Sequence, residues 1–132
     1  MQKFMSLEEL AENFSFFENW EEKYSYLIDL GKKVEPLNDV YKVDVYKVDG
    51  CTSNVWLVPD SSGECIVFQA DSDALIVRGL IMILFCAYYN KTKEEVAKID
   101  IEAFFTRIGM NQHLSPNRRN GFFAMVEKIK AL

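Results

Sequence analysis

The residue best suited to chemistry is a cysteine near the middle of the chain. Cys51 follows Gly50 and precedes the small polar residues Thr52, Ser53 and Asn54, a composition typical of a turn between two strands. A loop exposes a side chain that a packed strand would bury, and thiol chemistry needs an accessible thiolate. These residue types therefore allow a reactive nucleophile at Cys51, and they equally allow an incidental small residue at a tight turn.

The other two cysteines lie in apolar surroundings. Cys65 opens a predicted strand, and Cys86 lies inside a predicted helix among large hydrophobic residues. A free cysteine in such a setting behaves as a small buried hydrophobe, so we expect both in the core. Three cysteines without a close pair are not a disulfide framework, and they suit a reducing compartment. A cytoplasmic location is therefore expected.

The three cysteines and His113, the only histidine, would match the ligand count of a zinc site. No Cys-x-x-Cys pair occurs, however, and two of the cysteines are expected to be buried. We therefore expect no metal ion. The sequence also has no glycine-rich phosphate loop, no His-Glu-x-x-His motif and no nucleophile elbow, so no other catalytic constellation accompanies Cys51.

Three arginines occupy positions that call for a partner. Arg78 interrupts an apolar run, and a buried guanidinium requires a carboxylate or carbonyl beside it. Asp71 and Asp73, which also offer N-cap oxygens to the following helix, are the nearest carboxylates. Arg118 and Arg119 open the last predicted helix, where two cations oppose the positive end of the helix dipole. This pair is interpreted either as part of a partner surface or as a solvated pair.

The elements that position these residues begin with helices. Ser6 and Glu9 have the form of a capping box, which predicts a short helix ending near Asn13. Apolar residues at helical spacing predict a second helix over about 18–33, which Pro36 stops. The cysteine loop must therefore follow from the strands that come next in the chain.

The middle of the chain is predicted to form strands. Over 42–48 apolar and polar residues alternate with one slip, which indicates a strand with a bulge or kink just before Gly50. The segment 55–70 predicts a hairpin, whose turn lies in the stretch 59–63. Cys51 is thus expected in a turn between two strands.

The C-terminal half is predicted to be helical. The apolar run 74–89 is interrupted by Arg78, and the apolar part after this arginine is too short to span a bilayer, so we expect a buried helix. Thr92 and Asp100 are predicted caps of two short helices, and Ser115 precedes a proline at the start of the last one. Helix, then strands, then helices indicate an α+β fold, a small antiparallel sheet with flanking helices.

Length and composition limit the range of functions. A chain of 132 residues fits one domain over 1–132, and 49% hydrophobic residues supply its core. The net charge of −5 repels phosphate backbones, so nucleic acid is not an expected partner. The first residues contain no apolar stretch typical of a signal peptide, so neither secretion nor membrane attachment is expected.

Three segments of the chain carry a resemblance to a known family. The segment 48–56 reads Val-Asp-Gly-Cys-Thr-Ser-Asn-Val-Trp, and 70–80 reads Ala-Asp-Ser-Asp-Ala-Leu-Ile-Val-Arg-Gly-Leu. The segment 113–121 reads His-Leu-Ser-Pro-Asn-Arg-Arg-Asn-Gly and continues into Ala-Met-Val at 124–126. Together, and with the segment 24–31, they resemble the SufE family, also called SufE/CsdE, of iron–sulfur cluster assembly. The resemblance covers nearly the whole chain, in order and at the family's spacing.

The resemblance implies a function. A pyridoxal-phosphate-dependent cysteine desulfurase forms a persulfide on its own cysteine, and Cys51 would take the outer sulfur and pass it to a cluster scaffold similar to SufB. The carrier would stimulate the desulfurase, and it would itself bind neither pyridoxal phosphate nor a cluster. The implied fold resembles that of the IscU scaffold. Family members tend to keep the thiol in an apolar shelter until a partner draws it out.

The family motifs also imply contact residues. Gly50, Thr52 and Ser53 would belong to the cysteine loop, and Arg118 and Arg119 would help to form a docking surface. The family pattern has glutamine where this chain has Thr52 and again two residues later, and both replacements keep a hydrogen-bonding side chain of shorter length.

Two other readings remain open at the level of sequence. An IscU-type metal or cluster scaffold should bring several cysteines together, whereas this chain has one loop cysteine. A module that activates a desulfurase without carrying sulfur would not need the thiol of Cys51. We expect a sulfur carrier rather than either of these.

Overall fold

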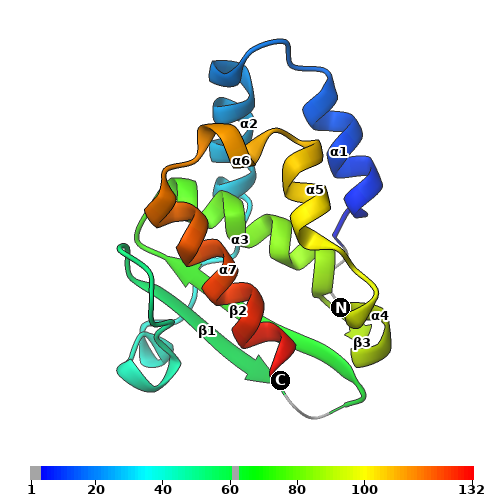
Figure 1. Ribbon diagram of the computed structural model, residues 1–132. Helices are drawn as coiled ribbons and strands as arrows, with labels where there is room; N and C mark the ends of the chain where they lie inside the picture. The colour runs from blue at the N-terminus through cyan, green and yellow to red at the C-terminus, as the bar shows by residue number, and fades with distance from the viewer. Residues whose placement is uncertain (1–3, 61–62) are drawn as a thin grey trace.

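Helices and a small sheet make up residues 4–60 and 63–132, which the computed structural model describes. The sheet has the order β1-β2-β3 and is antiparallel throughout (Figure 1). Its strands are β1 (Val55–Asp60), β2 (Cys65–Ser72) and β3 (Lys91–Thr92). The helices are α1 (Leu7–Ser15), α2 (Trp20–Lys32), α3 (Leu75–Tyr88), α4 (Lys93–Ala97), α5 (Ile101–Arg107), α6 (Met110–His113) and α7 (Pro116–Lys130). The predicted α+β fold is therefore confirmed.

Most of the predicted helix starts are confirmed. The side chains of Ser6, Thr92, Asp100 and Ser115 each accept the backbone N–H of the residue three positions further on, at 3.0–3.3 Å. Each bond satisfies one of the N–H groups that the first turn of a helix leaves without a partner. Four of the helices thus begin where the capping residues place them.

The helix α3 packs on β2, and α1, α2 and α7 all pack on α3 (Figure 1). The apolar residues of α7 that face the core are buried, namely Phe122, Met125, Val126 and Ile129. No helix among the described residues is both long and apolar enough to cross a membrane.

The contact between α2 and α3 is close enough to involve the backbone. A Cβ atom on Gly31 would lie 2.6 Å from the carbonyl oxygen of Leu75, and one on Gly79 would overlap the carbonyl oxygen of Leu27. Each glycine therefore lets the opposite helix approach to a distance that any side chain would prevent. This contact fixes the position of α3, on which the sheet rests.

The predicted hairpin is confirmed by the register of β1 and β2. Val55 lies opposite Ser72, and Asp60 lies opposite Val67. The predicted turn at 59–63 includes Ser61 and Ser62, which lie outside the described residues. Alternate strand residues face the helices and are buried, namely Val55, Leu57, Ile66, Phe68 and Ala70.

The predicted strand over 42–48 is wrong. The segment forms two short 3₁₀ turns, η1 (Asp39–Tyr41) and η2 (Asp44–Tyr46), and only Lys47 forms a bridge, with Trp56. The apparent alternation comes from two consecutive copies of Asp-Val-Tyr-Lys-Val, which repeat every five residues. Valines 40, 43 and 45 are exposed, so this segment has no apolar face to bury against a sheet.

Arg78 is half-buried and has the predicted kind of partner, and this changes the start of α3. The Nε atom of Arg78 lies 3.1 Å from Oδ1 of Asp71, and its Nη2 donates to the carbonyl of Val34. Asp71 is 3% exposed and also accepts the backbone N–H of Leu37 at 2.9 Å. Because both carboxylates before α3 bind elsewhere, no side chain caps α3 at Ala74, so the predicted N-cap is wrong.

Candidate functional site

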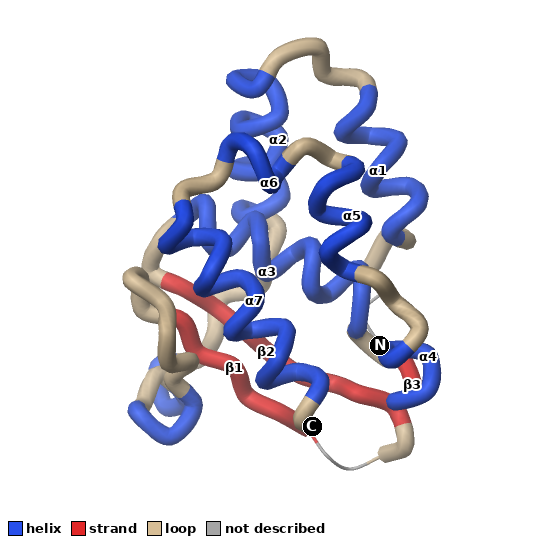
Figure 2. The backbone as a smooth tube through the Cα atoms, viewed as in Figure 1, coloured by secondary structure: helices blue, strands red, loops and turns tan. Residues whose placement is uncertain are grey.

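The loop 49–54 is closed at its base by backbone pairing. The N–H of Val48 donates to the carbonyl of Val55 at 2.8 Å, next to the bridge between Lys47 and Trp56. Gly50 has a φ of 89°, a left-handed conformation that glycine adopts without strain. The chain therefore reverses direction within the loop, and Figure 2 shows the loop beside the start of α7.

The far side of the loop is attached to the junction between β2 and α3. Asp73 accepts the backbone N–H of Asn54 at 3.2 Å and its side-chain N–H at 2.9 Å. The hydroxyl of Ser72 donates to the carbonyl of Asn54 at 2.7 Å. These polar contacts hold one end of the loop, while Gly50 leaves the other end with backbone freedom.

The thiol of Cys51 points toward α7. Its Sγ lies 3.6 Å from the carbonyl oxygen of Gly121, to which the S–H group donates. Cys51 is half-buried, and this burial raises the pKa of its thiol above the usual range; the negative charge of Asp49 raises it further. In this arrangement Cys51 is therefore a protonated, weakly nucleophilic thiol.

A small cavity of about 30 Å³ adjoins Cys51. Its apolar walls come from β1, α3 and α7, namely Val55, Val77, Leu80, Phe122 and Met125. Its polar rim consists of Thr52 and Ser53 from the loop, with Asn117 and Arg118 from the first turns of α7. The site is thus one thiol beside an apolar recess with a polar rim.

Comparison with known proteins places this chain in a family. The family model described as "SufE: Fe-S metabolism associated domain" matches residues 8–132. The chain belongs to the SufE family. This family has a role in iron–sulfur metabolism, which agrees with the resemblance of the three sequence segments.

Relatives of the SufE-family chain match it over nearly its full length. An uncharacterized SufE-like protein of Rhizobium meliloti (strain 1021) is 38% identical, over 96% of this chain and 93% of the relative. One of Rhizobium etli is 40% identical, over 95% of this chain and 87% of the relative. The solution structure of a hypothetical protein from Thermus thermophilus has a TM-score of 0.73 and 20% identity, covering 95% and 90% of the two chains, and it shows the same fold.

The loop residues expected from the SufE motifs lie together, and the two arginines do not. Cys51, Thr52, Ser53 and Arg118 line the same cavity, with Gly50 directly before the thiol. Arg118 also donates to the hydroxyl of Tyr24. Only this arginine of the pair therefore borders the thiol.

Arg119 is directed elsewhere. Its Nε donates to Oδ1 of Asn111 at 3.1 Å, and its guanidinium lies 5.0 Å from the ring centre of Phe123. Arg119 is half-buried by these contacts. It fixes α6 to α7 and contributes little free surface.

Two site residues were not anticipated from sequence. Gly121 contacts the thiol, and Asp73 holds Asn54. A signal existed for Gly121, because glycine inside a helix is unfavourable and often marks a close approach. Asp73 was expected to cap α3 or to bind Arg78, since nothing in the sequence relates it to position 54.

The remaining cysteines differ from one another. Cys86 is buried as predicted, and its burial raises the pKa of the thiol to about 11. The core position predicted for Cys65 is wrong, because it is half-buried on the face of β2 that points away from the helices. His113 stacks on Trp20 at 4.5 Å between ring centres. Within 4–60 and 63–132, no group of three His, Cys, Asp or Glu side chains could hold a metal ion.

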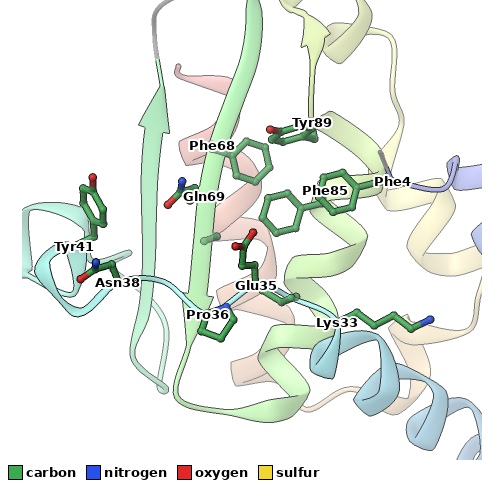
Figure 3. A pocket seen from close by; sticks show the side chains of 12 residues that line it. Phe4, Lys33, Glu35, Pro36, Asn38, Tyr41, Phe68, Gln69, Phe85 and Tyr89 are labelled. Carbon is green, nitrogen blue, oxygen red and sulfur yellow. The ribbon is translucent and has the colours of Figure 1, made fainter. Parts of the chain in front are cut away.

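A larger hollow of about 320 Å³ lies on another part of the surface. Aromatic rings form one of its walls, namely the stacked rings of Phe4, Phe85 and Phe68 with Tyr89 edge-on to them, and the carboxylate of Glu35 points toward them (Figure 3). The residues that line it include none of those around Cys51, and no cysteine is among them. Of these two hollows, only the smaller recess has a cysteine in its lining.

Proposed function

We propose that this SufE-family protein accepts sulfur on Cys51 from a cysteine desulfurase and passes it to an iron–sulfur cluster scaffold. The observation that carries the proposal is the thiol itself, on a loop beside an apolar recess, in a family tied to iron–sulfur metabolism. Such a carrier needs a single thiol that can be reached by two partners in turn. The desulfurase supplies the pyridoxal phosphate, and the carrier supplies the acceptor sulfur.

The transfer is a thiol exchange. The desulfurase carries a persulfide, and the thiolate of Cys51 attacks its outer sulfur. The bond between the two desulfurase sulfurs breaks, the desulfurase cysteine leaves as a thiolate, and Cys51 becomes the persulfide. No net oxidation occurs, because one sulfur–sulfur bond forms as another breaks. A second exchange of the same type delivers the sulfur to the scaffold.

Attack by Cys51 requires the loop to leave its sheltered position. In the closed arrangement burial raises the pKa of the thiol, so little thiolate exists at neutral pH. Moving the loop into contact with a partner reduces that burial and also separates Sγ from the carbonyl of Gly121. The two loop positions need differ by only a few kcal/mol for a partner to shift the equilibrium.

The docking surface includes the loop and Arg118. Arg118 is exposed at the rim of the recess, whereas the chain as a whole carries a net charge of −5. A cation beside the thiol favours a partner with acidic groups around its own reactive cysteine. The free thiols of this chain suit the reducing cytoplasm, which we propose as its location.

Persulfide mapping tests the proposal. The protein is incubated with a cysteine desulfurase and free cysteine, and the sulfur is located by mass spectrometry of intact protein and peptides. Cys51→Ser should abolish sulfur loading, whereas Cys65→Ser and Cys86→Ser should retain it. Loading of Cys51→Ser at the wild-type level would overturn the assignment. Stimulation of the desulfurase by Cys51→Ser as strong as by the wild type, with no loading of either, would instead favour an activator.

A further inference from the structure

We propose that Gly121 is a positioning residue that gives the closed loop room for one extra sulfur atom on Cys51, and for no larger group. The inference rests on the proposed function, because it concerns how a persulfide is stored between the two transfers. The missing side chain at position 121 would then set how large a group on Cys51 the recess can hold. The proposal follows from three observations around the thiol.

The first observation is the bare surface of α7 opposite the thiol. A Cβ atom on Gly121 would lie 3.2 Å from Sγ of Cys51 and 3.7 Å from its Cα and Cβ. Gly121 is not among the glycines with positive φ, so its backbone conformation does not require glycine. Glycine is also a poor helix former compared with alanine. The absence of a side chain at 121 is therefore explained by the loop that lies against it.

The second observation is the size of the recess. Its volume of about 30 Å³ leaves room beside the thiol for only a small group. A persulfide places its outer sulfur one bond of about 2.05 Å beyond Sγ. The recess therefore accepts one additional atom of this size, whereas a methyl group on residue 121 would occupy space next to the same sulfur.

The third observation is that the walls cannot yield. Leu80, Phe122 and Met125 are at most 1% exposed and belong to the main core. Close-packed interiors tolerate added volume poorly, so a group larger than one atom must move the loop rather than the walls. The closed loop would then retain a persulfide, and it would be displaced by a polysulfide or a mixed disulfide with a bulky thiol.

The first test loads Cys51 without a desulfurase, in a Cys65→Ser background. An aromatic disulfide converts Cys51 to a mixed disulfide, and hydrosulfide then displaces the aromatic thiolate and leaves the persulfide. Cyanide removes the outer sulfur as thiocyanate and restores the thiol. We expect the persulfide of Gly121→Ala to react at least about threefold faster than that of the parent, because its loop closes less often. Alkylation of the unloaded thiol by iodoacetamide should rise by a clearly smaller factor, because the added Cβ also crowds Sγ, from which it would lie 3.2 Å away.

Gly63→Ala is the matched control, because a Cβ there meets nothing within 4 Å. It should leave both rates unchanged. Equal cyanide reactivity of Gly121→Ala and its parent would overturn the proposal. A rise in alkylation as large as the rise in cyanide reactivity would also overturn it, because Gly121 would then merely pack the loop. Melting curves verify that each variant is folded.

A second measurement needs no change at position 121. Methyl methanethiosulfonate converts the Cys51 thiol of the same Cys65→Ser protein to a methyl disulfide, one carbon larger than the persulfide, and releases methanesulfinate. The backbone N–H of Asn54, which is bound to Asp73, reports loop closure by hydrogen exchange. We expect persulfide and thiol to protect it equally, and the methyl disulfide to lose protection by about threefold or more. Retained protection in the methyl disulfide would contradict a one-atom limit.

These experiments separate the inference from the proposed function. They use chemical loading, so they succeed or fail whether or not a desulfurase delivers sulfur to Cys51. If the desulfurase does not load Cys51 but the hydrogen-exchange pattern is as expected, only the carrier role is refuted. Enzymatic loading of Cys51 with no effect of Gly121→Ala would refute the role of Gly121 alone.

Discussion

The carboxylate of Asp73 accepts two hydrogen bonds from Asn54, one from the backbone N–H at 3.2 Å and one from the side-chain amide at 2.9 Å. This pair connects the last residue of the cysteine loop to Asp73, which lies two positions before the first residue of α3. Both partners are exposed, so water can replace the contact at modest cost. Asp73 and Asn54 therefore form a latch that a partner protein can release.

The first prediction concerns this latch. Asp73→Ala removes both hydrogen bonds, and in exposed surroundings their loss should cost roughly 1 kcal/mol of loop closure, or about fivefold in the open population. A bulky maleimide should therefore label Cys51 about fivefold faster. Asp100→Ala is the control, because it removes an exposed cap of α5 far along the chain. Equal labelling rates in the Asp73→Ala variant and the wild type would show that these bonds do not hold the loop.

The second prediction concerns pH. Burial and then the charge of Asp49 raise the pKa of Cys51, so less thiolate is present at a given pH than for a free cysteine. The alkylation rate of the wild type should rise with pH to a midpoint above the usual thiol value of about 8.5. Asp49→Asn removes a nearby negative charge, so the midpoint should move down and the rate at pH 8 should increase.

The control for the pH experiment is Asp44→Asn, which removes an exposed carboxylate of η2. Asp44 is not among the groups that raise the pKa of Cys51. Its midpoint should match the wild type within experimental error. An upward movement of the midpoint in Asp49→Asn would refute the electrostatic role of Asp49.

The third prediction separates the two neighbouring arginines. Arg118→Ala should weaken binding of a cysteine desulfurase by roughly 1 kcal/mol, with little effect on stability, because Arg118 is exposed beside the thiol. Arg119→Ala should lower the free energy of unfolding by about 1 kcal/mol, because it loses the bond to Asn111 and the contact with Phe123. Calorimetric titration and urea unfolding measure the two effects. The reverse pattern would move the docking surface to Arg119.

The fourth prediction concerns the ion pair between the buried Asp71 of β2 and the half-buried Arg78 of α3. Asp71→Ala leaves the guanidinium of Arg78 without its carboxylate and the N–H of Leu37 without an acceptor. Breaking a buried pair on one side typically costs about 3–5 kcal/mol, so urea unfolding should show a loss of that order. Asp29→Ala, which breaks an exposed contact of 4.0 Å with Lys32, should change stability by less than about 0.5 kcal/mol. A loss below about 1 kcal/mol in Asp71→Ala would indicate that Arg78 finds another partner.

Local signals in the sequence predict much of this fold because capping and hairpin pairing act over short distances. Thr92 and Ser115 start helices through side chains three residues from their partners, and the hairpin 55–72 follows from two apolar runs around a turn. The strand predicted over 42–48 was wrong because this prediction used the local pattern alone. Its alternation is real, but a strand also needs an apolar face that packs against the core, and whether it does depends on the whole fold.

The site was predictable only as far as its nucleophile. Cys51 is distinguished by the turn residues around it, and the family motif adds its neighbours and Arg118. The contacts that shelter it span long distances in sequence, since Gly121 lies seventy positions after Cys51. The different contacts of Arg118 and Arg119 depend on which face of α7 meets Tyr24 of α2 and which meets Asn111 of α6. No pattern within the helix itself contains that information.

The interlocked glycines of α2 and α3 bear on how tolerant this chain is to random mutation. Any replacement of Gly31 or Gly79 forces a side chain into a backbone carbonyl, so the two helices would have to separate and shift the support of β2. In a genetic selection for iron–sulfur enzyme activity, substitutions at these two positions would reduce growth as severely as substitutions of Cys51. Only the amount of folded protein in the cell would distinguish a variant that cannot fold from one that lacks the nucleophile.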